Sequence, residues 1–164
     1  MINILILLIC LILAAFDQII KWIVIKNLKP ISNTSLIDGF LSLHYTENRG
    51  AAFGSFQNMR WFFIILTLVV IIFFTIAIIK NKIKNKFLLF AIILILSGGI
   101  GNLIDRIFLG YVVDYIQVSF FPPIFNFADA CISIGAVLFI FYIIFLNKND
   151  TLFYSGRKND KEKN

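Results

Sequence analysis

Residues 61–79 form an apolar run that contains no charged side chain. A run of about 20 such residues crosses the hydrocarbon core of a bilayer as a helix, where every backbone hydrogen bond must be made internally. Residues 87–104 and 130–146 repeat this pattern, and an N-terminal run continues past Asp17 and Lys21. Because the 164-residue chain is 60% hydrophobic, little of it remains for a separate soluble domain.

These runs predict an α-helical membrane protein with four transmembrane helices in a single domain over residues 1–147. The first helix is expected to be retained, because no basic residue precedes its apolar run and no cleavage site of small residues follows it. Residues 148–164 are polar and are expected to form a cytoplasmic tail. The helices are expected at about residues 2–26, 61–80, 87–106 and 126–147.

The net charge of +6 gathers between the second and third helices and after the fourth. Basic loops mark the cytoplasmic side of a membrane protein, so both termini are expected inside and the 26–60 and 107–124 connections outside. This distribution indicates a membrane protein without a nucleic-acid partner. The residues that carry it are Lys80, Lys82, Lys84, Lys86, Lys148, Arg157, Lys158, Lys161 and Lys163.

The connection after the first helix contains a strand-like alternation of apolar and polar residues from Leu41 to Thr46. Asn48-Arg49-Gly50 is a turn signal, and a second short strand is expected through Ala51 to Phe53. These patterns predict a small extracytoplasmic β-cradle at about residues 30–57, over the outer ends of the helices. Such a sheet can bind an extended peptide by strand-like pairing.

Polar residues inside the spans are the next constraint. A central charge costs about 2.5–3.5 kcal/mol on insertion scales, so such residues usually face a protein interior or a wet cavity. Asp17 and Lys21 lie four residues apart and can pair across one helical turn. Gly98, Gly99 and Gly101 predict close approach of the third helix to its neighbours. The predicted topology places four aspartates toward the outer leaflet: Asp17, Asp105, Asp114 and Asp129.

Paired carboxylates are the favoured chemistry. Two aspartates in a low-dielectric site cannot both ionise easily, so the ionised member can activate a water while the protonated member polarises a carbonyl. Asp114 in V-V-D-Y-I and Asp129 in F-N-F-A-D are the candidate pair. Metal catalysis lacks its usual ligand spacings, with His44 the single histidine.

Each aspartate also has a plainer interpretation. Asp105 is followed by Arg106 and is consistent with a helix-end charge in a structural ion pair, while Asp129 lies near a helix N-terminus, where a carboxylate is favoured. Intramembrane carboxylates also mark proton or ion pathways. From the residues alone, a small proton-linked carrier therefore remains an alternative to a protease.

Five motifs then occur in order along nearly the whole chain: Asp17 with Lys21, N-R-G-A-A-F-G from Asn48, G-N-L-I-D-R from Gly101, V-V-D-Y from Val112, and F-N-F-A-D-A-C-I-S-I-G from Phe125. This order resembles the bacterial lipoprotein signal peptidases, or signal peptidase II, a family of intramembrane aspartyl proteases. One departure is Ile20, at a position where the family commonly has Thr or Ser.

The resemblance implies cleavage of the signal peptide from diacylglyceryl-modified prolipoproteins, just before the lipidated cysteine. It implies a bacterial inner membrane enzyme that works among membrane lipids and uses no metal or organic cofactor. Nothing in the sequence requires more than one chain, so a monomer is expected. It also implies a β-cradle and a short periplasmic helix above four spans. The implied site comprises a catalytic dyad, Asp114 and Asp129, with supporting roles for Asp17, Lys21, Asn48, Gly50, Asn102, Arg106 and Asn126.

Overall fold

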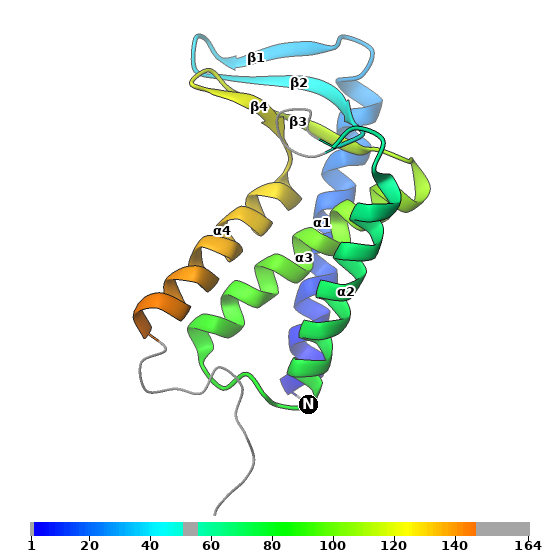
Figure 1. Cartoon of the computed structure of the whole chain (residues 1–164). Coiled ribbons are helices and arrows are strands. Elements are labelled where there is room, and N and C mark those ends of the chain that lie inside the picture. Colours follow the sequence, from blue (N-terminus) through cyan, green and yellow to red (C-terminus); the bar gives the residue numbers. More distant parts are fainter. Residues whose placement is uncertain (1, 51–55, 147–164) are drawn as a thin grey trace, which may run out of the picture.

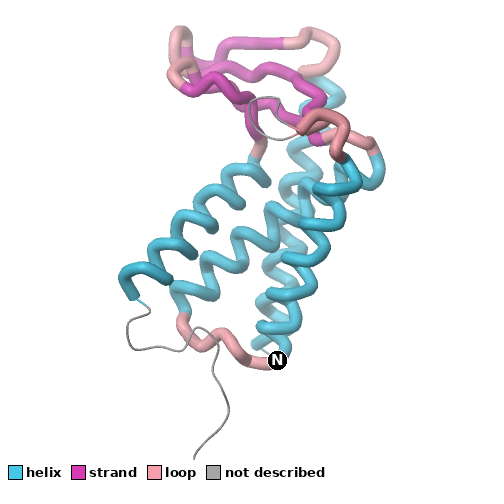
Figure 2. Tube along the Cα trace, in the orientation of Figure 1, coloured by secondary structure: helices cyan, strands magenta, loops and turns pink. Residues whose placement is uncertain are grey.

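The computed structural model describes residues 2–50 and 56–146, which form a helical bundle with a sheet at one end (Figures 1 and 2). All four helices are long and apolar enough to cross a membrane, when the π-helical end of the last one is included. The predicted strand at residues 51–53 and the predicted tail at 148–164 lie outside the described residues. The helices are α1 (Ile2–Asn27), α2 (Arg60–Ile79), α3 (Lys86–Phe108) and α4 (Phe127–Phe141), which continues as η2 (Tyr142–Leu146).

Helix α3 is the centre of the bundle and packs against each of the other three helices (Figure 1). In its most apolar 18-residue window 56% of the residues are buried, against 17–22% in α1, α2 and α4. The other helices therefore turn most of their large apolar side chains outward. An exposed apolar exterior around a buried centre is the arrangement that a lipid environment favours.

A glycine lets α4 start close against α3. A Cβ atom added at Gly98 would overlap the carbonyl oxygen of Ala128, in the first turn of α4. The next residue, Gly99, faces α2 instead, and its added Cβ would lie 3.5 Å from Thr67 Cγ2, which is an ordinary contact.

These two neighbouring glycines make a matched pair for mutation. We expect Gly98→Ala to destabilise the protein by about 1–3 kcal/mol, because the added methyl must displace backbone. Gly99→Ala should leave stability nearly unchanged. Thermal unfolding in detergent micelles measures both, and equal melting temperatures for the two variants would contradict this account of the α3–α4 contact.

The sheet has four antiparallel strands in the order β1-β2-β3-β4. The predicted strand around Leu41–Thr46 is confirmed as part of β2, and the predicted fold class of four spans with a small sheet is confirmed with it. Half of the sheet, however, comes from the connection between α3 and α4, where the sequence analysis assigned no strand. The strands are β1 (Asn33–Ile37), β2 (Leu41–Asn48), β3 (Val112–Val118) and β4 (Phe121–Phe125).

Strand β3 carries one candidate aspartate in its middle. Alternate residues of a strand point to opposite faces. Val113 and Tyr115 are buried and pack with Val24 and Leu28 at the end of α1. Asp114, between them in sequence, therefore points to the other face of the sheet, toward the start of α4. The short periplasmic helix that the resemblance implies is not among the helices of residues 2–50 and 56–146.

Candidate active site

The first turn of α4 holds a capping box. The Asn126 side chain accepts a hydrogen bond from the backbone N–H of Asp129 at 2.8 Å, and the Asp129 carboxylate accepts one from the backbone N–H of Asn126 at 3.3 Å. Each side chain thus satisfies a backbone donor that the helix start leaves unpaired. Because both hydrogen bonds lie within one helical turn, they orient the Asp129 side chain without help from other parts of the fold.

Asp114 accepts hydrogen bonds on both of its oxygens. Asn126 Nδ2 donates to Asp114 Oδ1 at 2.6 Å, and Asn48 Nδ2 donates to Oδ2 at 2.8 Å. The Asp114 side chain is only 1% exposed. Burial, together with the neighbouring charge of Asp129, raises the pKa of Asp114 to about 7. The two aspartates therefore share Asn126 as a neighbour, and the charge of Asp129 makes ionisation of Asp114 less favourable.

Asn102 of α3 contributes a second amide bridge. Its Nδ2 donates to Asp129 Oδ1 at 2.7 Å, and its Oδ1 accepts a hydrogen bond from Lys21 Nζ at 3.0 Å. Because an ammonium group can only donate, it requires the oxygen of Asn102 on its own side. The amide nitrogen of Asn102 must then face Asp129, so the orientation of this side chain is determined.

Lys21 also lies between two buried carboxylates. It contacts Asp17 Oδ2 at 2.8 Å, as the four-residue spacing predicts, and Asp105 Oδ2 at 3.0 Å. Asp105 thus does belong to a structural ion pair, but its partner is Lys21 and not the adjacent Arg106. Adjacent residues of a helix point in different directions. Asp105 therefore turns toward Lys21 of α1, while Arg106 turns toward Phe63 of α2 and the carbonyl of Gly50.

Gln18 is a functional candidate that the sequence analysis missed. Its Nε2 donates to Asp105 Oδ1 at 2.9 Å and to the Gly101 carbonyl at 3.0 Å, and it lies 3.4 Å from Asp17 Oδ2. The sequence does contain a signal for this role. Gln18 directly follows Asp17 of the intramembrane Asp17–Lys21 pair, where an amide donor can satisfy a carboxylate. Ile20 is partly buried against the apolar cluster of Val24, Leu28, Val113 and Tyr115, so the residue that departs from the family pattern makes an apolar contact here.

Arg106 and Gly50 lie near the mouth of the site. Arg106 reaches the Asn102 carbonyl at 3.5 Å and the Gly50 carbonyl at 3.4 Å, and its guanidinium stacks 4.9 Å from the ring centre of Phe63. Asn48 Oδ1 accepts a hydrogen bond from the Gly50 N–H at 2.9 Å, which forms the turn predicted at Asn48-Arg49-Gly50.

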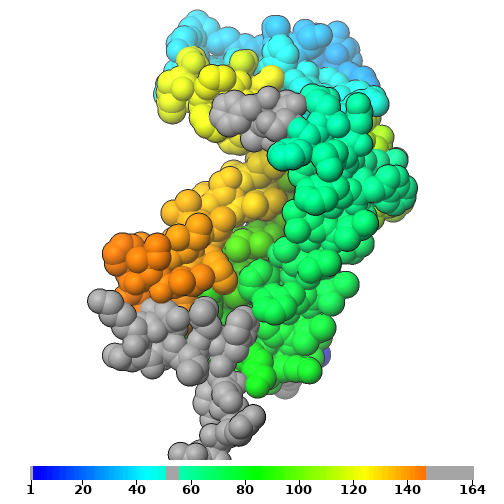
Figure 3. All heavy atoms as spheres, viewed as in Figure 1, coloured from blue at the N-terminus to red at the C-terminus, as the bar shows by residue number. Residues whose placement is uncertain are grey.

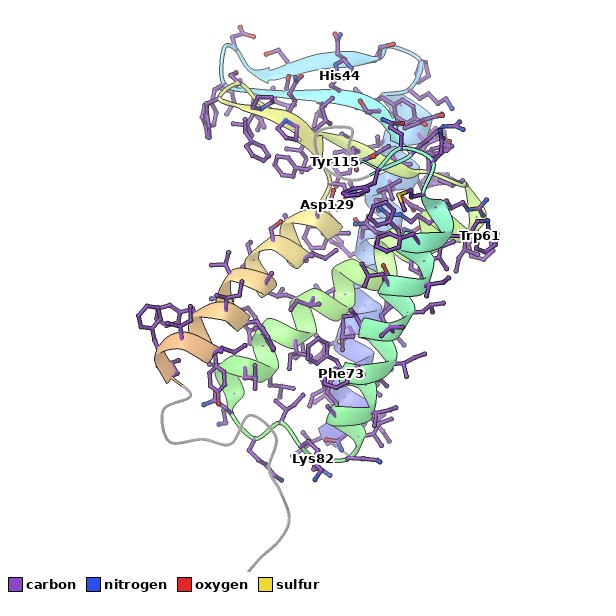
Figure 4. The ribbon with its side chains drawn as sticks, in the orientation of Figure 1. His44, Trp61, Phe73, Lys82, Tyr115 and Asp129 are labelled. Carbon is purple, nitrogen blue, oxygen red and sulfur yellow. The ribbon has the colours of Figure 1, made fainter. Side chains whose placement is uncertain are left out.

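A groove of about 630 Å³ runs between the sheet and α4. Figure 3 shows this hollow opening to the outside beneath β4 and above α4. In Figure 4, Asp129 lies at the sheet end of α4, below Tyr115 of β3, while His44 lies on the far part of the sheet. The walls are mainly aromatic and aliphatic, with a few polar groups. The predicted site residues that line the groove are Asn48, Gly50, Asn102, Arg106 and Asp129.

The remaining predicted residues lie behind this lining. Asp114 and Asn126 are buried and hydrogen-bonded to the lining residues Asn48 and Asn102, respectively. Lys21 is buried, binds Asn102 and pairs with the buried Asp17. Within residues 2–50 and 56–146, no three His, Cys, Asp or Glu side chains are grouped so that they could hold a metal ion. The site thus consists of two neighbouring carboxylates, one facing the groove, held by amides and a buried cation.

A pair of aspartates at the end of a membrane-spanning bundle, beside an open groove, is the arrangement that a membrane-embedded aspartic protease requires. A family model described as Signal peptidase (SPase) II matches residues 9–145 of this chain. The chain belongs to the signal peptidase II family. The predictions of an aspartic endopeptidase and of a bacterial membrane protein are thereby confirmed.

Individual relatives agree with this assignment. A lipoprotein signal peptidase of Caldanaerobacter subterraneus subsp. tengcongensis is 46% identical over 129 residues, which cover 79% of this chain and 88% of the relative. One from Streptococcus thermophilus is 45% identical over 129 residues, covering 78% and 84%. A bacterial membrane enzyme solved by the in meso method at 2.3 Å resolution has a TM-score of 0.78 with this chain, at 32% identity and 93% coverage of both chains. Another, solved at 1.9 Å, has a TM-score of 0.75 at 35% identity, covering 89% of this chain and 94% of that one.

Proposed function

We propose that this protein removes the signal peptide from diacylglyceryl-modified prolipoproteins, cutting just before the lipidated cysteine. The observation that carries the proposal is the convergence of Asp114 from β3 and Asp129 from α4 on one shared neighbour, Asn126. The names of the relatives, lipoprotein signal peptidases, supply the substrate class.

The proposed reaction uses the two aspartates as an acid–base pair. With one proton held between them, the ionised carboxylate takes a proton from a water bound in the groove. The resulting hydroxide attacks the carbonyl carbon of the peptide bond before the cysteine, while the protonated aspartate donates a hydrogen bond to the carbonyl oxygen. Collapse of the tetrahedral intermediate breaks the C–N bond, and an aspartate proton goes to the leaving amine.

The groove suits a lipidated peptide in two ways. Its apolar lining residues can bury acyl chains, while its polar lining residues offer donors to a peptide that must be extended to be cut. Asn48, Asn102 and Arg106 supply those donors at the groove wall. Pro122 and Pro123 of β4 have no backbone N–H, so strand-like pairing along this edge is restricted and side-chain donors carry more of the binding.

We also propose that the sheet lies on the outer side of the membrane. The lysine-rich connection at residues 80–86 lies at the opposite end of the bundle, where Figure 4 labels Lys82. Basic residues favour the cytoplasmic side. Near the sheet end, Trp22 lies under Lys26 at 5.2 Å and Trp61 under Arg60 at 5.3 Å, pairs that suit a membrane interface. Both termini would then be cytoplasmic, with the dyad near the outer interface.

The test is cleavage of a lipidated precursor by the purified protein in lipid micelles, followed by mass measurement of the products. We expect one cut, immediately before the modified cysteine, and none in the precursor that lacks the diacylglyceryl group. Cutting at another bond would contradict the substrate assignment. Carboxylate-dependent proton flux across liposomes without any cleavage would instead favour the carrier alternative.

The dyad also predicts a bell-shaped dependence of kcat on pH. Because the pKa of Asp114 is raised to about 7 by burial and by Asp129, the shared proton is lost as the pH rises past this value, and the rate should fall there. At low pH the second carboxylate becomes protonated, which stops water activation. Initial rates across about pH 4–9 measure both limbs. A rate that is flat through neutral and alkaline pH would contradict the shared proton.

Thermal unfolding provides an independent check on the same group. A pKa raised from 3.8 to about 7 means that folded Asp114 binds a proton that the unfolded chain has released between these pH values. Its contribution to stability is therefore complete below about pH 4 and is lost as the pH rises toward 7. Asp114→Asn should remove this part of the pH dependence.

A further inference from the structure

Each residue that immediately precedes a dyad aspartate donates its backbone N–H to a buried carboxylate. Ala128, before Asp129, donates to Asp17 Oδ1 at 3.1 Å. Val113, before Asp114, donates to Asp105 Oδ2 at 3.0 Å. One carboxylate therefore holds the start of α4 and another holds the middle of β3, each one residue away from the proposed chemistry.

Lys21 joins these two carboxylates. Its ammonium group contacts Asp17 at 2.8 Å, Asp105 at 3.0 Å and Asn102 Oδ1 at 3.0 Å. An ammonium has three N–H donors, and these contacts provide three acceptors. Lys21, Asp17 and Asp105 are each at most 2% exposed, so water is not available to replace a lost contact.

We propose that Asp17, Lys21 and Asp105 form a spacer that sets the distance between the Asp114 and Asp129 carboxylates; this deepens the proposed function and rests on it. Three positioning residues, rather than catalytic ones, would then fix the geometry of the dyad. The same unit reaches Asp129 a second time, because Lys21 orients Asn102 and Asn102 donates to Asp129.

The chain connection alone cannot set this distance. Asp114 and Asp129 belong to different elements, a strand and a helix, and β4 with its turn lies between them in sequence. Across the dyad, Asn126 holds the carboxylate of Asp114, but it makes no contact of this kind with the backbone of β3. The spacer instead holds backbone on both sides, and backbone position decides where each carboxylate can reach.

A spacer and a merely structural ion cluster differ in the pH profile that they predict. The repulsion between two carboxylates falls with their separation, and this repulsion keeps the two limbs of the bell apart. If the spacer is loosened and the two carboxylates move apart, the two limbs of the pH profile should lie closer together and kcat should fall. A loss of stability alone would reduce the amount of active enzyme and leave the shape of the bell unchanged. The charged and titratable groups around the dyad are Asp17 and Lys21 from α1, Asp105 and Arg106 from α3, and Tyr115 from β3.

Lys21→Arg and Asp105→Asn are the informative variants, with kcat, KM and the pH profile measured on the lipidated precursor. Lys21→Arg keeps the charge but replaces a compact ammonium by a larger planar group, so it tests the spacing at constant charge. We expect kcat to fall roughly 10²-fold, the size associated with a displacement of about 1 Å, with a narrower bell and little change in KM. Asp17→Asn combined with Asp105→Asn should cost less than the sum of the single losses, because both act through Lys21.

Lys29→Gln is the matched control, because it removes an exposed ion pair with Glu47, 3.0 Å long, and should keep kcat and the pH profile of the natural protein. If the spacer variants fold poorly, Gln18→Leu removes a donor to Asp105 and leaves all three charges, and a smaller narrowing is expected. An unchanged bell width in every folded variant of the spacer would overturn the inference. Turnover that survives Asp114→Asn would instead overturn the dyad, so the two failures are distinguishable.

Discussion

Replacing either Asp114 or Asp129 by Asn should abolish precursor cleavage, with a loss of roughly 10⁴-fold or more in kcat. The substitution preserves size and shape but removes the ability to ionise and to exchange a proton. In this site each carboxylate also accepts two hydrogen bonds, from Asn48 and Asn126 at Asp114 and from Asn102 and the Asn126 backbone at Asp129. An amide can accept only on its oxygen, so one of the two donors loses its partner in each variant.

The rates should be compared at equal amounts of folded, membrane-inserted protein. The double variant should be no slower than either single variant, because the two groups act as one unit. Asp38→Asn is the matched control: this exposed carboxylate in the β1–β2 turn accepts a hydrogen bond from Ser35 at 2.6 Å, and its loss should leave cleavage intact. Substantial turnover by purified Asp114→Asn or Asp129→Asn would exclude the proposed dyad.

Substitution of Asn126 should have the second largest effect on kcat. Suitable variants should separate its capping of α4 from its hydrogen bond to Asp114. Asn126→Ser keeps a side-chain oxygen that can accept from the Asp129 N–H, so the cap of α4 survives. It removes the Nδ2 that donates to Asp114 Oδ1 at 2.6 Å and to Asn102 Oδ1 at 3.3 Å. We expect near-normal thermal stability with a kcat lowered roughly 10²-fold, since the donor fixes one reacting carboxylate. Asn126→Ala should lose the same activity and, in addition, about 1 kcal/mol of stability.

The start of α3 offers a matched control for this pair. Asn85 caps that helix by accepting hydrogen bonds from Phe87 N at 2.9 Å and Leu88 N at 3.2 Å, at the end of the bundle away from the dyad. Asn85→Ala should therefore lose similar stability and retain kcat. If Asn126→Ser cleaves the precursor as fast as the natural protein, the amide bridge between the two aspartates has no catalytic role.

Local patterns predicted the membrane-spanning elements well. Spans of apolar residues determine the helices because lipid leaves backbone groups no partner outside the helix, so length and hydropathy are sufficient signals. The Asp17–Lys21 pair was also readable, because residues four apart on a helix meet without any help from the fold. The same holds for the glycines at positions 98 and 101, whose close contacts follow from their place in a packed span.

The second half of the sheet was harder to predict. Residues 112–118 follow helix α3, and their burial does not alternate. Val112, Val113, Asp114 and Tyr115 are all buried, so the segment lacks the period-two pattern by which a half-buried strand is predicted. Strand pairing is a long-range property: β2 meets β3 only after two complete helices have intervened. The prolines of β4 also weaken any strand signal there, although an edge strand tolerates them.

The sequence by itself determined the class of protein: four apolar spans, the capping pair at Asn126 and Asp129, and an ordered set of polar motifs that belongs to one family. Only the tertiary structure decided which buried polar residues bind one another. It joined Asp105 to Lys21 instead of Arg106, recruited Gln18, and sorted the polar residues into a groove lining and a buried support. The physical reason is that a buried charge must find its partners wherever packing places them, and packing brings together residues that no local spacing relates.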